Sequence, residues 1–499
     1  MRAILICVAA LSALLPLNPA HAASTMDPRV ADIDAFIRTA MTKAGATPGL
    51  ALVVVDGDQV VMAEGYGVAD MRTGQPVDAD TGFYIASATK SFTALAIAAM
   101  AARGEVDLTA PVSQWADDSG LAPDLAQSAS LADLLSHTSG LDNNPIAFRA
   151  AYSGDHNPAV MQGLLSRTVR LSDTPHGVFK YSNAGYNLAT TLLEARFGRD
   201  WRAMVRDEVL APTGMSHTTA RVSEAKQGVL AVGHLGDGVG AARPSPLQKV
   251  DATMQSAGGL ISTASDMGRW LELQINDGVI DGQRIFPAGL VASTHTALAR
   301  QDVRFGSYQR DGYGLGWQTG LYGSNRLIHH FGNFSGSRAH VSFMPERRLG
   351  VAVMVNEDLV TGDLADLVAN YVYDRFADRP DLEAVYAAEL EQLTIRRDSR
   401  RQRLAAAKAE RAARPWSLPE PLDHYVGVYE SPALGRMDVR EVEGRMLISI
   451  GVLSSIPEAY SEQGSVRVEL VPFQGEVVTF EGADRLVFEG EPFLRGPRP

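Results

Sequence analysis

Cysteine is nearly absent from this sequence of 499 residues. The only one, Cys7, lies in a short apolar segment at the start of the chain. The rest of the chain therefore contains no thiol. That excludes a disulfide framework, a cysteine nucleophile and a thiolate metal site from all residues after Cys7.

Basic residues are fewer than acidic ones, and long hydrophobic runs are scarce. The chain has 45 Lys and Arg against 58 Asp and Glu, a formal net charge of −13, so we expect no nucleic-acid partner. After the first residues no stretch is long and apolar enough to span a bilayer, so we expect no stable membrane span. An apolar fraction of 45% and a charged fraction of 21% are typical of a globular protein. The length suits one large domain with a smaller one.

The first residues have the pattern of a secretory signal peptide. A charged start, Met1-Arg2, precedes a short apolar run over 3–15, and Ala20-His21-Ala22 supplies small residues at the two positions that matter for cleavage. We predict a signal peptide over 1–22, cleaved after Ala22, and a protein that is periplasmic or secreted.

Composition changes near residue 380 and again near residue 419. The stretch 23–380 mixes helix and strand patterns, as expected for one large domain. The stretch 381–418 is highly charged and predicts a helical linker ended by prolines. Its arginine-rich block would also suit binding to an anionic membrane or nucleic acid, which is the alternative to a helix lying on the large domain. Short apolar runs in 419–499 predict a small β-barrel or sandwich domain.

Periodicity within the large domain predicts several individual elements. Apolar residues at helical spacing predict a helix over 27–43, and two apolar runs joined by Asp-Gly-Asp predict a hairpin over 49–67. Further strands are predicted at 313–317, 326–333, 339–344 and 349–356, and a closing helix at 364–376.

A serine followed three residues later by a lysine stands at the start of an Ala-rich apolar helix. Residues three apart share one helix face, so Ser87 and Lys90 can meet one turn apart. A lysine amine can take the serine proton only if its pKa is depressed, and desolvation by the surrounding apolar residues favours this. The helix N-terminus beside Ser87 also favours a developing oxyanion. Alone, the pattern also fits an N-capped helix with an exposed lysine.

Two other polar clusters follow along the chain. Tyr181-x-Asn183 precedes a helical pattern, and His330-x-Gly332 lies in a predicted strand. His137, in a loop after a short predicted helix, is a candidate general base, although a structural role is favoured for it. No His-Glu-x-x-His and no Gly-x-Ser-x-Gly motif is present, so the sequence indicates neither metal catalysis nor an α/β-hydrolase.

In their order along the chain, the three clusters resemble the motifs of the serine β-lactamase and penicillin-binding-protein superfamily. The branch they resemble most is class C-like and includes D-aminopeptidases, D-alanyl-D-alanine carboxypeptidases and esterases. The resemblance covers about 28–380. It implies that 23–380 is a catalytic domain with a β-lactamase-like α/β (α+β) fold, in which helices flank a central antiparallel sheet. The 419–499 segment is similar, more weakly, to lipocalin-like barrels appended to some of these hydrolases.

The resemblance also implies roles for the residues of the first two clusters. Ser87 would attack a carbonyl and form an acyl-enzyme. Lys90 and Tyr181 would share the general-base work, each with a depressed pKa. Asn183 would hold a substrate amide and orient Lys90. No cofactor and no metal are implied.

The third cluster would line the substrate. His330 and Gly332 would contact it, and the backbone N–H groups of Ser87 and Asn333 would form the oxyanion hole. β-Lactamases and carboxypeptidases usually carry the lysine of Lys-Thr-Gly at the position of His330, where its fixed charge meets a substrate carboxylate. A histidine, with an ordinary pKa of about 6.5, is largely neutral at pH 7. We expect His330→Lys to favour carboxylate-bearing substrates.

The departure at His330 favours the aminopeptidase and esterase members of the group. We therefore predict a secreted serine hydrolase that forms an acyl-enzyme on a peptide, amide or ester, with a small-molecule or peptide substrate as its partner. The alternatives are a β-lactamase or D-alanyl-D-alanine carboxypeptidase, and a non-catalytic binding protein on the same fold. The sequence predicts no oligomeric state.

Overall fold

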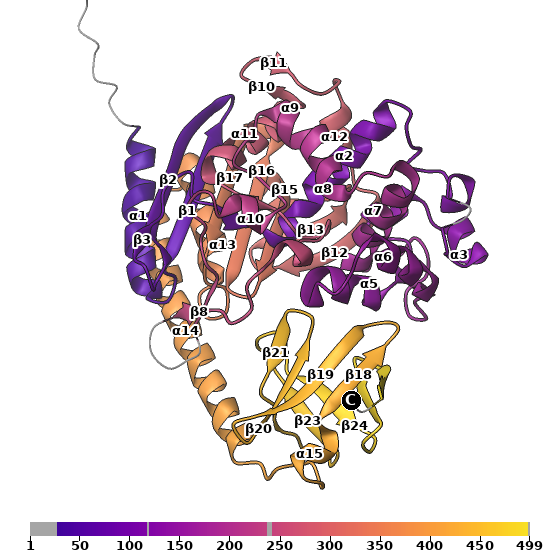
Figure 1. Ribbon diagram of the computed structural model, residues 1–499. Coiled ribbons are helices and arrows are strands. Elements are labelled where there is room, and N and C mark those ends of the chain that lie inside the picture. The colour runs from indigo at the N-terminus through magenta and orange to yellow at the C-terminus, as the bar shows by residue number, and fades with distance from the viewer. Residues whose placement is uncertain (1–26, 117–118, 237–241, 498–499) are drawn as a thin grey trace, which may run out of the picture.

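The computed structural model describes residues 27–116, 119–236 and 242–497. The predicted signal peptide over 1–22 and Cys7 lie outside these residues. Figure 1 shows a large body of helices and strands, a smaller β-domain below it, and the long helix α14 (Leu382–Ala412) between the two. None of the helices in the described ranges combines the length and hydropathy that crossing a membrane requires.

One antiparallel sheet of nine strands forms the centre of the body and confirms the predicted fold class. Its spatial order is β12-β13-β14-β15-β16-β17-β1-β2-β3, so the last strand of the body lies beside the first. The strands are β1 (Gly49–Asp56), β2 (Gln59–Asp70), β3 (Gln75–Pro76), β12 (Ala299–Phe305), β13 (Tyr308–Tyr313), β14 (Gln318–Tyr322), β15 (Asn325–Phe334), β16 (Ser337–Met344) and β17 (Leu349–Val355).

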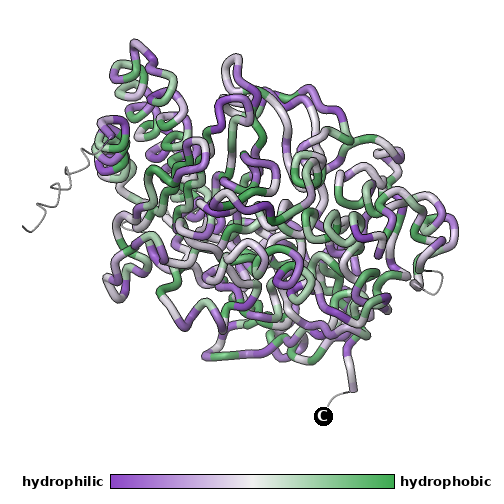
Figure 2. Tube along the Cα trace, turned by 90° about the horizontal axis from the view of Figure 1, so that it is seen from above, coloured by the Kyte–Doolittle hydropathy of each residue, from purple (hydrophilic) through white to green (hydrophobic). Residues whose placement is uncertain are grey.

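Helices cover both faces of this sheet. In β1, Leu52 and Val54 pack into one core with α1 and α13, whereas Ala51 and Val53 pack into another with α2 and α11. Burial on both faces explains why β1 is a continuous apolar run. In Figure 2, α1 adjoins the grey N-terminal trace and alternates between hydrophilic and hydrophobic residues, as a helix with one buried side must. These helices are α1 (Pro28–Ala44), α2 (Thr89–Ala102), α11 (Ala264–Ile275) and α13 (Asp363–Phe376).

Apart from α7 (Asn183–Phe197, 15 residues), the remaining elements of the body are short. The helices are α3 (Pro123–Ser128), α4 (Leu131–Leu135), α5 (Asn144–Phe148), α6 (Pro158–Leu164), α7 (Asn183–Phe197), α8 (Trp201–Val205), α9 (Ala211–Thr213), α10 (Val222–Ala225) and α12 (Leu290–Thr294). Two-residue strands are β4 (Phe83–Tyr84), β5 (Leu141–Asp142), β6 (Val169–Arg170), β7 (His234–Leu235), β8 (Arg243–Pro244), β9 (Ile261–Ser262), β10 (Val279–Ile280) and β11 (Gln283–Arg284). The 3₁₀ helices are η1 (Ala86–Ala88), η2 (Val112–Gln114), η4 (Leu165–Arg167), η6 (Asp251–Thr253) and η7 (Pro345–Arg347). Two π-helical segments are η3 (Arg149–Ser153) and η5 (Arg206–Leu210).

Most elements predicted within the body are confirmed, with one exception. The helices over 27–43 and 364–376 are α1 and α13, and the hairpin over 49–67 is β1–β2. The strand predicted over 313–317 is wrong, because the chain turns between β13 and β14 at this point. Gly316 has a φ of 80°, a left-handed conformation that glycine adopts without strain, and it lies against Ser91 of α2.

Helix α14 connects the body to the smaller domain. Arg396 and Arg400 each lie 3.0 Å from Asp363 of α13, and Arg411 lies 2.6 Å from Glu458 of the smaller domain. These arginines are therefore paired with carboxylates of the same chain. The first half of α14 buries apolar side chains on the body, namely Leu382, Tyr386, Leu390 and Leu393.

The smaller domain is a half-barrel made of one nine-stranded antiparallel sheet. Its spatial order is β21-β20-β19-β18-β26-β25-β24-β23-β22. Its elements are α15 (Leu422–Tyr425), β18 (Gly427–Ser431), β19 (Gly435–Val442), β20 (Arg445–Ile450), β21 (Leu453–Ser455), β22 (Glu458–Ala459), β23 (Ser465–Val468), β24 (Glu476–Phe480), β25 (Arg485–Phe488) and β26 (Glu491–Arg495).

The half-barrel shares its hydrophobic core with the body. Phe148 and Leu247 of the body belong to the same buried cluster as the inward side chains of the half-barrel. Buried Arg149 donates hydrogen bonds to the Ala433 carbonyl (2.7 Å) and the Pro432 carbonyl (3.3 Å). The half-barrel is thus fixed on η3 by apolar packing and by backbone hydrogen bonds.

Candidate active site

The candidate nucleophile lies where a tight turn enters a buried helix. Ser87 is in η1, directly before α2, and almost every residue of α2 is buried because the helix is rich in alanine and other apolar residues. Phe92 of α2 stacks on Trp270 of α11 with ring centroids 3.7 Å apart. The helix that carries the candidate site is therefore held rigidly in the core. Its first N–H groups have no acceptor within the helix and favour negative charge.

Lys90 connects three parts of the site. Its Nζ lies 3.3 Å from Ser87 Oγ, 2.8 Å from Asn183 Oδ1 and 2.7 Å from the Ala257 carbonyl oxygen. A neutral amine has two N–H donors and one lone pair. If the amide oxygen and the carbonyl take the two donors, the lone pair is left for the Ser87 hydroxyl. The structure thus places a proton acceptor beside the candidate nucleophile.

Burial favours the neutral form of this amine. Lys90 is completely buried, and desolvation lowers its pKa well below the usual value. The described residues place no carboxylate in an ion pair with it. Its nearest ring is that of Tyr181, whose centroid is 4.7 Å from Nζ. The sequence-based expectation of a depressed Lys90 pKa agrees with this environment.

The pKa of Tyr181 is shifted in the direction opposite to the one expected from the sequence. Its hydroxyl is hydrogen-bonded to Ser87, but burial of that hydroxyl raises the pKa of Tyr181 instead of lowering it. The residue as a whole is 41% exposed, so one side of the ring faces solvent while its polar end lies in the site. The expected depressed pKa is wrong, because the described residues bring no cation close enough to outweigh desolvation. Tyr181 therefore stays protonated and can donate and relay a proton.

Asn183 is the first residue of α7. Ser182 caps this helix by accepting a hydrogen bond from the Ala184 N–H at 3.0 Å, which fixes the entry of the chain into α7. The Asn183 amide oxygen then faces Lys90. Lys90 and Asn183 are 93 residues apart in sequence, and the cap brings them together.

Gly332 lets β15 approach the turn that carries Ser87. A Cβ atom at this position would overlap the carbonyl oxygen of Ile85, two residues before Ser87. The close approach brings the backbone of Asn333 to the same place as the first turn of η1, so the N–H groups of Ser87 and Asn333 are candidates for one oxyanion hole.

Replacing Gly332 by alanine is expected to reduce kcat/KM by at least about 10²-fold, because the added methyl group pushes β15 away from η1 and misplaces the reacting groups. Gly163→Ala is the matched control, since its Cβ would meet no atom within 4 Å in helix α6. We expect full activity and equal or higher Tm for the control. Equal activities of the two variants would contradict the role given to Gly332.

His330 lies in the site as a buried ring with both nitrogens engaged within the protein. Its Nε2 is 3.1 Å from the Tyr313 hydroxyl, and its Nδ1 is 2.9 Å from the Phe331 carbonyl oxygen. The ring is 3% exposed, and burial lowers the pKa of His330 to about 3. The histidine is neutral, as predicted. Both of its ring nitrogens are engaged within the protein, and the substrate contact predicted for His330 stays a prediction. A lysine at 330 would bury a second amine near Lys90, and the gain for carboxylate substrates expected of His330→Lys stays a prediction.

Tyr313 and His137 position the residues of this part of the site. The sequence analysis does not include Tyr313 among the site residues, and it favours a structural role for His137. Tyr313 orients His330, but the sequence pattern around it was interpreted as a strand. His137, at a φ of 63°, accepts a hydrogen bond from the Ser182 N–H (3.3 Å), and its carbonyl accepts one from the Lys180 N–H (2.9 Å). His137 thus fixes the backbone on both sides of Tyr181, which is the structural role favoured from the sequence.

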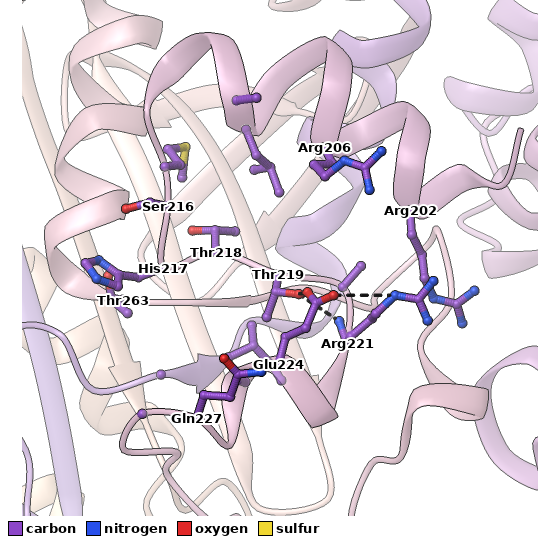
Figure 3. A pocket seen from close by; sticks show the side chains of 18 of the residues that line it. Arg202, Arg206, Ser216, His217, Thr218, Thr219, Arg221, Glu224, Gln227 and Thr263 are labelled. Atoms are coloured by element: carbon purple, nitrogen blue, oxygen red, sulfur yellow. Dashed lines mark hydrogen bonds and ion pairs between the residues drawn. The ribbon is translucent and has the colours of Figure 1, made fainter.

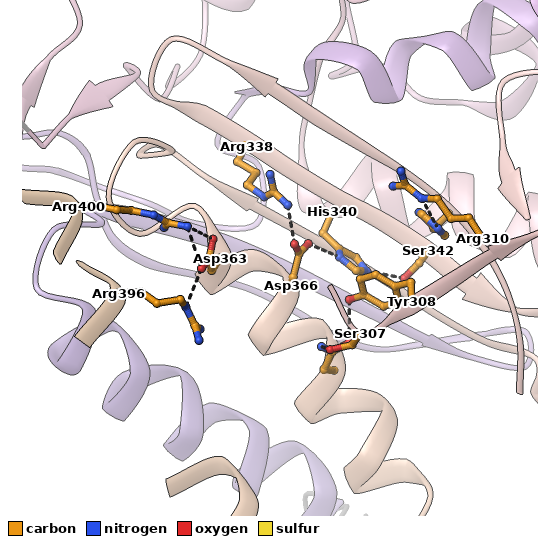
Figure 4. A network of polar contacts seen from close by, with 12 residues as sticks. Ser307, Tyr308, Arg310, Arg338, His340, Ser342, Asp363, Asp366, Arg396 and Arg400 are labelled. Atoms are coloured by element: carbon orange, nitrogen blue, oxygen red, sulfur yellow. Dashed lines mark hydrogen bonds and ion pairs between the residues drawn. The ribbon is translucent and has the colours of Figure 1, made fainter. Parts of the chain in front are cut away.

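A second serine resembles a nucleophile but is sealed. Ser342 Oγ lies 2.7 Å from His340 Nε2, and His340 Nδ1 lies 2.8 Å from Asp366 Oδ1, as Figure 4 shows. This order of atoms is that of a Ser-His-Asp triad. Both Ser342 and His340 have no exposed surface, because they lie between the sheet and α13. The array therefore stabilises the packing of α13 and is closed to substrate.

A cavity of about 790 Å³ lies away from Ser87, which is not among its lining residues. Figure 3 shows one of its arginines, Arg221, beside Glu224. Arg221 lies 3.6 Å from Glu224 and 3.8 Å from Asp200, and Arg202 lies 3.7 Å from Asp200. The charges of Arg202 and Arg221 are thus balanced locally.

Comparisons with known proteins agree with this geometry. The family model described as Beta-lactamase matches residues 33–371. Unguisins hydrolase ungD of Aspergillus violaceofuscus is 26% identical over 335 residues, which are 62% of this chain and 58% of that protein, so the chain spans little more than half of this relative. The D-alanyl-D-alanine-carboxypeptidase/endopeptidase AmpH of Escherichia coli strain K12 is 26% identical over 384 residues, 73% of this chain and 94% of the relative.

The fold is also that of a solved structure. The octameric penicillin-binding protein homologue from Pyrococcus abyssi superposes with a TM-score of 0.59 at 20% identity, over 93% of this chain and 100% of that one. At this identity the likeness shows the fold alone.

Proposed function

Because the chain belongs to the β-lactamase family, whose characterised members are serine hydrolases, we propose that it forms an acyl-enzyme on Ser87 with a peptide, amide or ester substrate. The observation that supports this most strongly is the contact between Lys90 Nζ and Ser87 Oγ at 3.3 Å, in surroundings that keep the amine neutral. A neutral amine beside a serine hydroxyl can take its proton and so activate the serine as a nucleophile.

The reaction would proceed by two acyl transfers. Lys90 takes the Ser87 proton as Oγ bonds to the carbonyl carbon, and the carbonyl oxygen becomes an oxyanion held by the N–H groups of Ser87 and Asn333. When the bond to the leaving group breaks, Tyr181 gives its proton to that group and recovers one from Lys90. Water then attacks the acyl-enzyme, with the proton transfers reversed, and releases the acid and free Ser87.

The neutral surroundings of His330 support amide and ester substrates over β-lactams. A β-lactam or a peptide C-terminus brings a carboxylate, and neutral His330 offers it no charge, unlike the lysine usual at this position. We expect kcat/KM at pH 7 to be higher for a short-chain chromogenic ester or an aminoacyl anilide than for a chromogenic cephalosporin. A preference for the cephalosporin would replace this proposal by the β-lactamase or carboxypeptidase alternative.

We also propose that the protein is exported. The supporting observation is the charged, apolar and small-residue pattern of residues 1–22. N-terminal sequencing of the mature protein recovered outside the cytoplasm is expected to begin at Ala23. An intact Met1 on the active protein would contradict export through cleavage.

A further inference from the structure

A second lysine lies in an aromatic box close to the candidate site. Lys249 Nζ is 3.7 Å from the ring centroid of Phe334, 5.5 Å from that of Tyr84 and 5.7 Å from that of Tyr152. Aromatic faces attract a cation through their negative electrostatic potential. The box thus holds an ammonium group without a neighbouring carboxylate, since no acidic group of the described residues forms an ion pair with Lys249.

One hydrogen-bond position of this ammonium group is free. Lys249 donates to the Ala151 carbonyl at 2.5 Å and to the Thr253 carbonyl at 3.2 Å, which uses two of its three N–H groups. A cavity of about 40 Å³ adjoins it, lined among others by Leu247, Phe334 and Ser335. That space holds about three water molecules, or the oxygens of one carboxylate. The site therefore has a charge, a free donor and room for a small anionic group.

The box borders both halves of the predicted oxyanion hole. Phe334 directly follows Asn333 in β15. Tyr84 lies three residues before Ser87, and its hydroxyl donates to the carbonyl of Gly258, which in turn packs against the Ser87 backbone. Lys249 therefore contacts two aromatic residues that adjoin the two candidate oxyanion donors.

The direction of β15 tells which part of a substrate Lys249 faces. At one end of the site, His330 packs near Tyr181, with ring centroids 6.1 Å apart. Because Tyr181 supplies the proton for the leaving group, the leaving group lies toward that end. Phe334 is four residues further along the strand, beyond the oxyanion donor. The acyl portion of the substrate thus lies toward Phe334 and Lys249.

We propose that Lys249 binds a carboxylate, or a similar anionic group, on the acyl portion of the substrate and thereby sets acyl-chain preference. This inference rests on the proposed function, because it needs an acyl-enzyme on Ser87. It goes beyond that function by placing a cation on the acyl side, opposite the position where the family's Lys-Thr-Gly lysine lies and this chain has neutral His330.

The charge of Lys249 is sensitive to pH. Burial lowers the pKa of Lys249 to about 7, so the group is cationic below that pH and neutral above it. The titratable groups that face it are Tyr84 and Tyr152, and burial raises the pKa of both phenols, so they stay neutral. Glu476 and Glu489 of the half-barrel act on Tyr152 from further away. Preference for an anionic acyl group should therefore fall as pH rises through about 7.

The test compares two esters of equal length, mono-4-nitrophenyl glutarate and 4-nitrophenyl valerate, after subtraction of uncatalysed hydrolysis. The readout is the ratio of kcat/KM for glutarate to that for valerate, at pH 6 and at pH 8.5. Lys249→Met is expected to lower this ratio about tenfold at pH 6, the effect of losing one charged hydrogen bond. Lys249→Arg is expected to keep the ratio high and to extend it to pH 8.5, because a guanidinium stays charged. Lys226→Met, at an exposed lysine after α10, is the charge-matched control and should keep the native ratio.

The possible outcomes separate the two proposals. If the wild type hydrolyses valerate but its ratio equals that of Lys249→Met, Lys249 has only a structural role and this inference is overturned, while the proposed function stands. If the wild type hydrolyses neither ester nor an aminoacyl anilide, the proposed function fails and this inference fails with it. If Lys249→Met does not fold, the pH dependence of the wild type and the ratio of Lys249→Arg decide, and a ratio that is flat with pH in the wild type counts against the inference.

Discussion

Replacing Ser87 by alanine should abolish turnover of every substrate while the protein remains folded. The expected loss in kcat is at least about 10⁴-fold, because the covalent step disappears and only binding and the oxyanion donors remain. Tm should change little, since Ser87 is only half-buried and its removal leaves the apolar packing of α2 unchanged. The measurement is kcat for a chromogenic ester, together with thermal unfolding of both proteins.

Ser342→Ala is the matched control for that experiment. It removes a hydroxyl that contacts His340 and Tyr373 at 2.7 Å each in a sealed part of the core, so it should lower Tm and keep turnover. The two serine variants are thus expected to have opposite effects on activity and stability. Activity that survives in Ser87→Ala and disappears in Ser342→Ala would move the nucleophile to the buried array and contradict the account.

Lys90→Met should also lose turnover, by at least about 10³-fold, because it removes the proton acceptor while preserving length and apolar character. Its stability relative to wild type should depend on pH. The folded wild type holds Lys90 neutral, whereas the unfolded chain protonates it below about 10.4, so the unfolded state binds more protons. Wild-type stability therefore falls as pH decreases, and the methionine variant has no such loss. The difference in free energy of unfolding should shift in favour of Lys90→Met from pH 9 to pH 6.

Lys90→Arg tests the opposite change, a side chain at position 90 that always carries a charge. A guanidinium cannot lose its proton at these pH values, so the variant buries a charge that has no carboxylate to pair with among the described residues. We expect it to be inactive and less stable than Lys90→Met at every pH. Denaturant unfolding at pH 6, 7.5 and 9 checks both variants. A Lys90→Arg protein as stable as the methionine variant would contradict the claim that this position disfavours a buried charge.

Periodicity alone predicts only the contacts of the site between residues that are close together in the sequence. Ser87 and Lys90 meet because they are three residues apart in one helical turn, and that relation can be deduced from periodicity alone. Gly332 and Asn333 could be placed only through their likeness to known motifs. The body sheet and its two-sided burial were also accessible, since the apolar run over 50–55 fits a strand that is covered on both faces.

The parts that sequence missed depend on long-range contacts. The Ala257 carbonyl that accepts from Lys90 is a backbone atom and leaves no mark in the residue type. The Tyr181 pKa was expected in the wrong direction because its sign depends on how much of the hydroxyl is buried, which spacing does not give. Tyr313 was assigned to a strand that continues to 317, whereas the left-handed Gly316 turns the chain and leaves the Tyr313 hydroxyl on His330.

The central claim is that turnover passes through an acyl group on Ser87. The most direct measurement is mass spectrometry of the enzyme quenched during turnover of a slow ester, followed by peptide mapping of the adduct. The account predicts one acyl group per chain on the peptide that contains Ser87, formed faster at high pH than at low pH and absent from Ser87→Ala. An adduct on another residue, or steady turnover with no adduct on Ser87 at any quench time, would contradict it.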